Sequence, residues 1–172
     1  MAASPDLAAL AGQVHRALLA RRETVAAAES LTAGLLCAAL ASVPGASATL
    51  RGGAVVYATD LKATLAGVPE GVLAEHGPVS PQTAAALAEG IRLRCGADWG
   101  VGLTGVAGPD PVDGHGPGRV YLGTSDGERT DVAQLDLPGG RADVRSAAVA
   151  SAFRTLLERL AGKPSSVTGV TP

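Results

Sequence analysis

The chain has 172 residues, of which 47% are apolar and only 2% aromatic, and its formal net charge is −2. This length is typical of one domain that buries its core without metals or disulfides, and the scarcity of aromatic rings favours layered α/β packing. The acidic balance offers no basic face for nucleic acid, no apolar stretch is long enough for a bilayer, and the N-terminus lacks the pattern of a secretory signal. Cys37 and Cys95 are expected to be reduced, buried side chains, and the three histidines show no metal-ligand spacing. We therefore expect a soluble cytoplasmic protein without a metal or cofactor.

Helix and strand patterns alternate along the first half of the chain. Ser4, Pro5 and Asp6 are typical of a helix start, and apolar residues then recur at helical spacing from residue 7 to 18. The other elements predicted here are a strand at 24–28, a helix at 31–42, a loop at 43–53, a strand at 54–57, a short helix beginning near Asp60 and a helix from Pro81 to Cys95.

The second half predicts three strands and a final helix. The strands are expected at 99–104, 120–123 and 132–137, with a long glycine- and proline-rich loop at 105–118, and the final helix runs from about 141 to 160. Residues 163–172 offer nothing to bury and are expected to be a disordered tail. The pattern predicts a single domain over residues 1–162, a three-layer α/β/α sandwich with a mixed β-sheet.

Polar residues follow the first buried strand in the stretch AESLTAG. Ser30 has two interpretations, as the N-cap of the next helix or as a nucleophile beside free backbone N–H groups. Glu29 favours a functional interpretation because an acid that ends a buried strand is costly unless it is paired. Thr32 and Gly34 fit both interpretations. In an α/β sheet, ligands collect beyond the carboxyl ends of strands, and the loops at 29–34, 57–62 and 104–109 lie there.

Basic residues and one tyrosine supply further candidates. The chain has 12 arginines and two lysines, and Lys62 directly follows a predicted strand. Unlike arginine, a partly buried lysine can act as a general base, although a solvated helix residue is the alternative. Tyr57 is either a core residue or a hydroxyl at the rim of a site. Arg141 and Arg145 share one face near a helix N-terminus, where they either form surface salt bridges or bind an anionic ligand.

Five segments together resemble the C-terminal domain of the CinA family, the nicotinamide-nucleotide amidohydrolases. They read AESLTAG, VPGASATLRGGAVVYATDLKATLAGVP, HGPVSPQTAAALAEG, GADWGVGLTGVAGPD and GRVYLG, and they occur in the family's order from about residue 7 to 162. Longer members carry a further N-terminal domain that resembles molybdopterin-binding proteins, for which these 172 residues leave no room. The resemblance implies an α/β/α domain that hydrolyses the carboxamide of nicotinamide mononucleotide (NMN) to nicotinate mononucleotide and ammonia, needs no cofactor, and forms a homo-oligomer.

The resemblance also implies roles for individual residues. Ser30 matches the expected nucleophile, and Lys62 is expected to deprotonate it, either directly or through Tyr57 or Ser47. Arg141 and Arg145 match basic positions that contact phosphate. The residues expected to bind substrate are Glu29, Thr32, Gly34, Thr104, Gly105, Arg141 and Arg145.

The chain departs from the family pattern at three places. Leu31 stands where the family has cysteine, Ala33 where it has the first glycine of a pair, and the loop PDPVDGHGPGR replaces one richer in glycine that carries a lysine. Two alternatives to NMN hydrolysis remain at this point: a catalytically silent domain of this type that binds a nucleotide or a partner, and a hydrolase that acts on a related amide.

Overall fold

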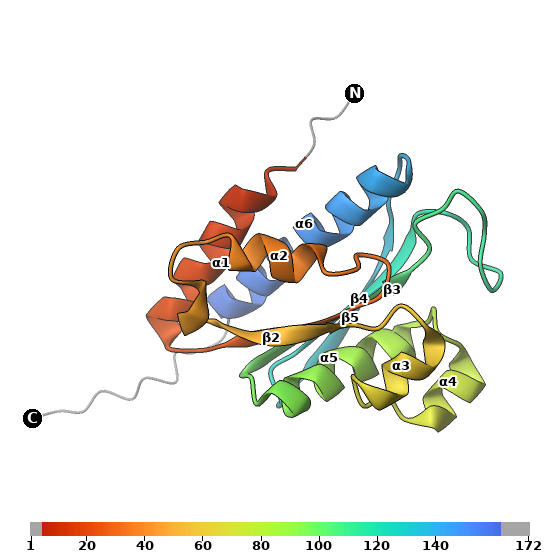
Figure 1. The fold of residues 1–172 in the computed structure, drawn as a ribbon, viewed down its shortest axis with the longest axis horizontal. Helices are drawn as coiled ribbons and strands as arrows, with labels where there is room; N and C mark the ends of the chain where they lie inside the picture. The colour runs from red at the N-terminus through yellow and green to blue at the C-terminus, as the bar shows by residue number, and fades with distance from the viewer. Residues whose placement is uncertain (1–4, 163–172) are drawn as a thin grey trace, which may run out of the picture.

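The computed structural model describes residues 5–162 and contains one five-stranded sheet between two layers of helices (Figure 1). The sheet has the order β2-β1-β3-β4-β5; β1 is parallel to both of its neighbours, whereas β3–β4 and β4–β5 are antiparallel. This confirms the predicted α/β/α sandwich with a mixed sheet. The strands are β1 (Val25–Glu29), β2 (Leu50–Val55), β3 (Trp99–Gly105), β4 (Arg119–Ser125) and β5 (Thr130–Asp136).

Helices cover both faces of the sheet (Figure 1). One layer holds α1 (Leu7–Arg21), α2 (Leu35–Ala41) and α6 (Arg141–Gly162), and the other holds α3 (Thr59–Thr64), α4 (Glu70–His76) and α5 (Pro81–Cys95). A short 3₁₀-helix, η1 (Ala46–Ala48), precedes β2.

Strand β1 lies between the two cores and is buried along its whole length. Val25 and Ala27 pack into the core formed with α1, α2 and α6, while Ala26 and Ala28 pack into the core on the side of α5. The alternation follows from the two-residue period of a strand. A strand buried on both faces has a continuous apolar sequence, and this is why β1 could be predicted.

Helix α5 packs directly against β3 and β4 because three glycines leave room for its backbone. A methyl group at Gly100, Gly102 or Gly123 would collide with the backbone oxygen of Ala84 or Ala88 in α5. The Ser80 side chain caps this helix by accepting a hydrogen bond from the N–H of Thr83. The glycines therefore set the distance between α5 and the sheet.

Helix α2 begins later than predicted. Its N-cap is Gly34, and residues 30–33 form a turn in which the N–H of Ala33 donates to the carbonyl of Ser30 at 3.1 Å. The interpretation of Ser30 as a helix N-cap is therefore wrong. Ala33 in this turn has a φ of 49°, a left-handed conformation that favours glycine.

Strand β2 begins at Leu50, four residues before the predicted start. Gly52 and Gly53 made this segment resemble a loop, because glycine is a poor strand former. Gly53 is needed in the strand because a Cβ atom there would collide with the carbonyl oxygen of Ala27 and the sulfur of Cys37. Helix α4 was not predicted.

The first helix begins at the predicted start. Asp6 is the N-cap of α1, and its carboxylate accepts a hydrogen bond from the N–H of Ala9 at 2.9 Å. Ser4 and the predicted disordered tail at 163–172 lie outside the described residues. Among residues 5–162, none of the helices combines the length and the apolar character needed to span a membrane.

Candidate functional site

A cavity of about 220 Å³ lies where the parallel strands β1, β2 and β3 end. The parallel arrangement brings the loops after these three strands to one edge of the sheet, and the start of α6 completes the wall. Leu31, Val79 and Val106 give the cavity an apolar side. Six of the predicted site residues line it: Ser30, Tyr57, Lys62, Thr104, Gly105 and Arg141.

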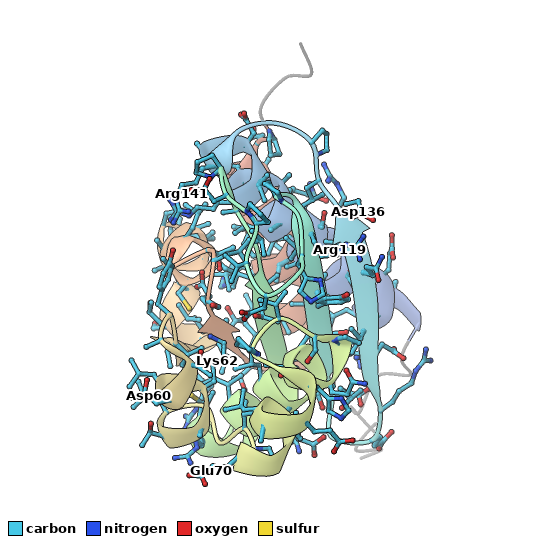
Figure 2. The ribbon with its side chains drawn as sticks, turned by 90° about the vertical axis from the view of Figure 1, so that its right-hand side faces the viewer. Asp60, Lys62, Glu70, Arg119, Asp136 and Arg141 are labelled. Carbon is cyan, nitrogen blue, oxygen red and sulfur yellow. The ribbon has the colours of Figure 1, made fainter. Side chains whose placement is uncertain are left out.

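Ser30 and Lys62 meet inside this cavity. The Nζ atom of Lys62 lies 3.2 Å from Oγ of Ser30, 2.9 Å from the carbonyl oxygen of Val56 and 3.3 Å from that of Tyr57. Lys62 is 2% exposed and Ser30 is 8% exposed. Lys62 therefore lies in the interior, while Asp60 on the same helix lies at the periphery (Figure 2).

Burial lowers the pKa of Lys62 below its ordinary value, and the carboxylate of Asp60 opposes this by raising it. A neutral amine has two N–H groups and one lone pair. If the two N–H groups donate to the carbonyls of Val56 and Tyr57, the lone pair is left for the hydroxyl proton of Ser30. Desolvation and these carbonyls thus arrange Lys62 as a base for Ser30.

Glu29 is buried but does not line the cavity. Its carboxylate accepts hydrogen bonds from the N–H groups of Gly34, Leu36 and Cys37 at 2.9–3.0 Å. These are N–H groups at the N-terminus of α2, which have no partner inside the helix. Glu29 is therefore a helix cap reached from the preceding strand, and both of its oxygens are engaged by N–H groups of the described chain.

Thr32 and Gly34 also lie outside the cavity lining. Thr32 is fully buried, and its hydroxyl has no hydrogen-bond partner among the described residues. Gly34 has a φ of 92° and serves as the N-cap of α2. The positive φ of the turn explains why glycine stands here, so its presence does not indicate a ligand contact.

Tyr57 and Arg141 meet at the mouth of the cavity. Nη2 of Arg141 donates to the phenolic oxygen of Tyr57 at 2.7 Å, and Nη1 donates to the carbonyl of Gly108 at 2.9 Å. Tyr57 is 55% exposed, so its ring belongs to the rim and not to the core. Its hydroxyl is bonded to Arg141, whereas Lys62 contacts only its backbone carbonyl.

Arg145 lies one helical turn after Arg141 but does not line the cavity. Its Nε donates to the carbonyl of Leu31 at 3.0 Å, and its Nη2 donates to the carbonyl of Thr32 at 2.9 Å. The two arginines were expected to act together on phosphate. The structure instead places one at the mouth of the cavity and the other against the turn that carries Ser30.

Thr104 and Gly105 end strand β3 beside the cavity. The hydroxyl of Thr104 donates to the carbonyl of Pro78 at 2.6 Å, so it holds the segment before α5 against the sheet. A Cβ atom at Gly105 would lie 2.5 Å from the carbonyl oxygen of Arg119, so β4 alone explains the absence of a side chain there.

Ser47 is not part of this group. It lies exposed in η1, and the next element, β2, begins beside Val25 at the amino end of β1. Ser30 follows the carboxyl end of β1, so the strand's length separates the two serines. The expectation that Ser47 assists Lys62 is therefore wrong for the described chain, because a serine at the other edge of the sheet cannot reach the amine.

Besides Leu31, nine further residues line the cavity and were not singled out as site residues from the sequence. Pro78 and Val79 belong to a quoted segment, HGPVSP, but apolar residues in a loop give no chemical signal on their own. No three His, Cys, Asp or Glu side chains within residues 5–162 gather as a metal-ligand set. The nine are Thr59, Pro78, Val79, Val106, Ala107, Gly108, Asp110, Val112 and Asp113.

Comparison with known proteins identifies the family of the chain. The model of the CinA C-terminal domain family matches residues 7–160. A CinA-like protein of Frankia casuarinae is 47% identical over 157 residues, which cover 91% of this chain and 36% of that protein. A putative competence-damage inducible protein of Streptococcus thermophilus is 41% identical over 159 residues, or 92% and 38% of the two chains. This chain thus spans little more than a third of the length of these relatives.

Solved structures show the same fold. A CinA superfamily protein of Klebsiella pneumoniae superimposes with a TM-score of 0.90 at 29% identity, covering 92% of this chain and all of the other. The competence/damage inducible protein CihA of Agrobacterium tumefaciens gives 0.85 at 32% identity, with coverages of 92% and 98%. The chain therefore belongs to the CinA family and corresponds to its C-terminal domain.

Proposed function

We propose that the chain is an amidohydrolase that converts NMN to nicotinate mononucleotide and ammonia. The single observation that carries the proposal is the contact between Nζ of Lys62 and Oγ of Ser30 inside a small cavity. A hydroxyl beside a desolvated amine is the serine–lysine version of an activated nucleophile. The family resemblance supplies the substrate.

The size of the cavity suits one ring with a carboxamide. An apolar cavity of roughly 150 Å³ holds benzene, and the cavity here is about 220 Å³. A pyridine ring would occupy the interior with its carboxamide near Ser30, and the ribose and phosphate would extend toward the mouth. There Arg141 uses two of its N–H groups on Tyr57 and Gly108, so three of the five remain for a phosphate.

The reaction follows in two stages. The neutral amine of Lys62 takes the proton of the Ser30 hydroxyl, and Oγ attacks the carboxamide carbon to form a tetrahedral oxyanion. The ammonium of Lys62 then returns the proton to the nitrogen, the C–N bond breaks, and ammonia leaves an ester on Ser30. In the second stage Lys62 takes a proton from water, whose oxygen attacks the ester carbon. The C–Oγ bond then breaks, the ammonium of Lys62 returns the proton to Oγ of Ser30, and nicotinate mononucleotide leaves. No atom or electron is left over, and Lys62 ends neutral as it began.

The test measures ammonia released from NMN by the purified full chain, Ser30→Ala and Lys62→Met. We expect turnover by the unchanged chain and a loss of about 10³-fold or more in each variant. Hydroxylamine added to the reaction should divert the ester to a hydroxamate, which mass spectrometry detects. Calorimetric binding of NMN without ammonia release would overturn the proposal and favour the silent binding domain. Turnover of nicotinamide riboside but not of NMN would favour a different amide substrate.

A further inference from the structure

Arg145 donates to two consecutive carbonyls in the turn that follows Ser30. The acceptors are Leu31 at 3.0 Å and Thr32 at 2.9 Å, more than a hundred residues away in the chain. The carbonyl of Ser30 accepts from the N–H of Ala33, and the N–H of Ser30 donates to the carbonyl of Leu103 at 2.9 Å. Hydrogen bonds thus hold three carbonyls of the turn and also the N–H of Ser30, where the turn starts.

Two backbone N–H groups in this turn have no hydrogen-bond partner among residues 5–162, those of Leu31 and Thr32. A trans peptide group is planar, and its N–H points opposite to its C=O. The bond from Arg145 to the carbonyl of Leu31 therefore fixes the direction of the Thr32 N–H. Thr32 is fully buried and does not line the cavity, whereas Leu31 does. The bond from Ala33 to the carbonyl of Ser30 fixes the Leu31 N–H, and Arg145 holds the same Ala33 peptide at the carbonyl of Thr32.

The position of Arg145 is poorly explained by stability. It lies in the second turn of α6, where a positive charge opposes the helix dipole. Within the described chain it forms no ion pair with a carboxylate, so its two hydrogen bonds are to neutral carbonyls. A partly buried cation beside the nucleophile favours the negative charge that develops on a tetrahedral oxygen.

We propose that Arg145 is a positioning residue that fixes the N–H of Leu31 as the oxyanion hole for Ser30. It acts through the Thr32–Ala33 peptide, whose carbonyl it holds and whose N–H donates to the carbonyl of Ser30. The proposal rests on the proposed function, because an oxyanion forms only if Ser30 attacks a carbonyl. It replaces the phosphate contact that the family resemblance implied for Arg145. The two roles differ in a measurable way: a positioning residue acts on kcat for every substrate, whereas a phosphate contact acts on KM for phosphorylated substrates only.

The experiment compares Arg145→Gln and Arg145→Lys with the unchanged chain on NMN and on nicotinamide riboside, which lacks the phosphate. Arg145→Gln should lower kcat by roughly tenfold to a hundredfold with both substrates, because a misplaced reacting group costs about that much. KM should change little. The kcat of Arg145→Lys should lie between those of Arg145→Gln and the unchanged chain, since an ammonium group keeps the charge but lacks the fixed fork of a guanidinium. Arg154→Gln, an exposed arginine on the same helix, is the matched control and should leave kcat unchanged.

Pyridine-3-carbaldehyde provides a second measurement. Its carbonyl carbon accepts Oγ of Ser30 to give a hemiacetal, the serine proton passes to Lys62, and no group leaves, so its inhibition constant reports the oxyanion hole directly. Arg145→Gln should weaken inhibition by about the same factor as it lowers kcat. Unchanged inhibition together with a raised KM for NMN alone would overturn the proposal in favour of a phosphate contact.

The two proposals fail in different ways. If the unchanged chain releases no ammonia, the proposed function fails. If it is active and Arg145→Gln keeps both its kcat and its inhibition by the aldehyde, only the role of Arg145 fails. Should Arg145→Gln not fold, Arg145→Lys carries the same comparison, and thermal unfolding of each variant separates lost structure from lost catalysis.

Discussion

Asp60 and Lys62 share the six-residue helix α3, and the carboxylate of Asp60 raises the pKa that burial of Lys62 lowers. Asp60 is exposed at the periphery, whereas Lys62 lies in the interior (Figure 2). Lys62 lines the cavity together with Ser30. The amine can accept the proton of Ser30 only when it is neutral. The balance between these two influences therefore sets the pH at which the site becomes competent.

The pH dependence of kcat/KM should follow the neutral fraction of Lys62. Activity should rise with pH through an inflection below the ordinary lysine pKa, because burial favours the neutral amine. Asp60→Asn removes the charge that raises this pKa, so the inflection should move to lower pH and activity near neutrality should increase. Glu70→Gln, at an exposed acid at the start of α4, is the control and should leave the profile in place. An alkaline shift in Asp60→Asn would contradict this account.

The same pKa shift links pH to stability. Because folding lowers the pKa of Lys62, the amine keeps its proton up to a higher pH in the unfolded chain than in the folded one. The unfolded state then binds more protons between the two pKa values, and the free energy of unfolding rises with pH across that window. Urea unfolding at a series of pH values should show this slope in the unchanged chain and lose it in Lys62→Met.

Tyr57→Phe tests whether the phenol relays protons. Its hydroxyl is bonded to Arg141 and not to Ser30 or Lys62, so removing it should loosen the guanidinium at the cavity mouth. We expect KM for NMN to rise by up to about tenfold, the value of one charge-assisted hydrogen bond, with kcat nearly unchanged. Steady-state kinetics measure both. A collapse of kcat at constant KM would show that the phenol takes part in proton transfer.

Glu29→Ala tests the cap of α2. Three backbone N–H groups would lose a buried carboxylate, so the free energy of unfolding should fall by at least about 2 kcal/mol. Urea unfolding measures the loss. Glu75→Ala, at a glutamate whose side chain is 77% exposed, serves as the control and should change stability little. A loss of NMN affinity without a loss of stability would instead support the substrate contact expected from the sequence.

Ala33→Gly should stabilise the protein. Ala33 has a φ of 49°, a conformation that costs a residue with a Cβ more than it costs glycine. The net gain should be about 1 kcal/mol after the greater freedom of glycine in the unfolded chain is included. Ala38→Gly, inside α2, is a matched control with the opposite sign, since glycine within a helix costs about 1 kcal/mol. Chemical denaturation of the two variants would decide the matter.

The sequence predicted the features that depend on local pattern. The apolar run of β1, the proline that opens α5 and the polar residues after two parallel strands were enough to predict a cavity edge shared by Ser30 and Lys62. That edge follows from topology, because parallel strands end on the same side of a sheet. The sequence pattern and the topology of the sheet therefore place the cavity at the same edge.

The features that the sequence did not predict depend on contacts between distant segments. Glu29 reads as a costly buried acid, and nothing local shows that its partners are the first N–H groups of α2. Arg145 reads as a ligand for anions until the structure brings it against the carbonyls of Leu31 and Thr32. Ser47 shares a family motif with Tyr57, but β2 lies between them and carries them to opposite edges of the sheet.

The contact of α5 with Gly100, Gly102 and Gly123 reaches the cavity through the start of that helix. Pro78 and Val79 come just before α5, form part of the cavity wall, and are tied to β3 by the hydroxyl of Thr104. Lifting the helix by the thickness of one methyl group would draw this wall outward while Ser30 and Lys62 stayed with β1 and α3. The dimensions of the cavity are therefore governed partly from the middle of the sheet, by glycines that do not line it.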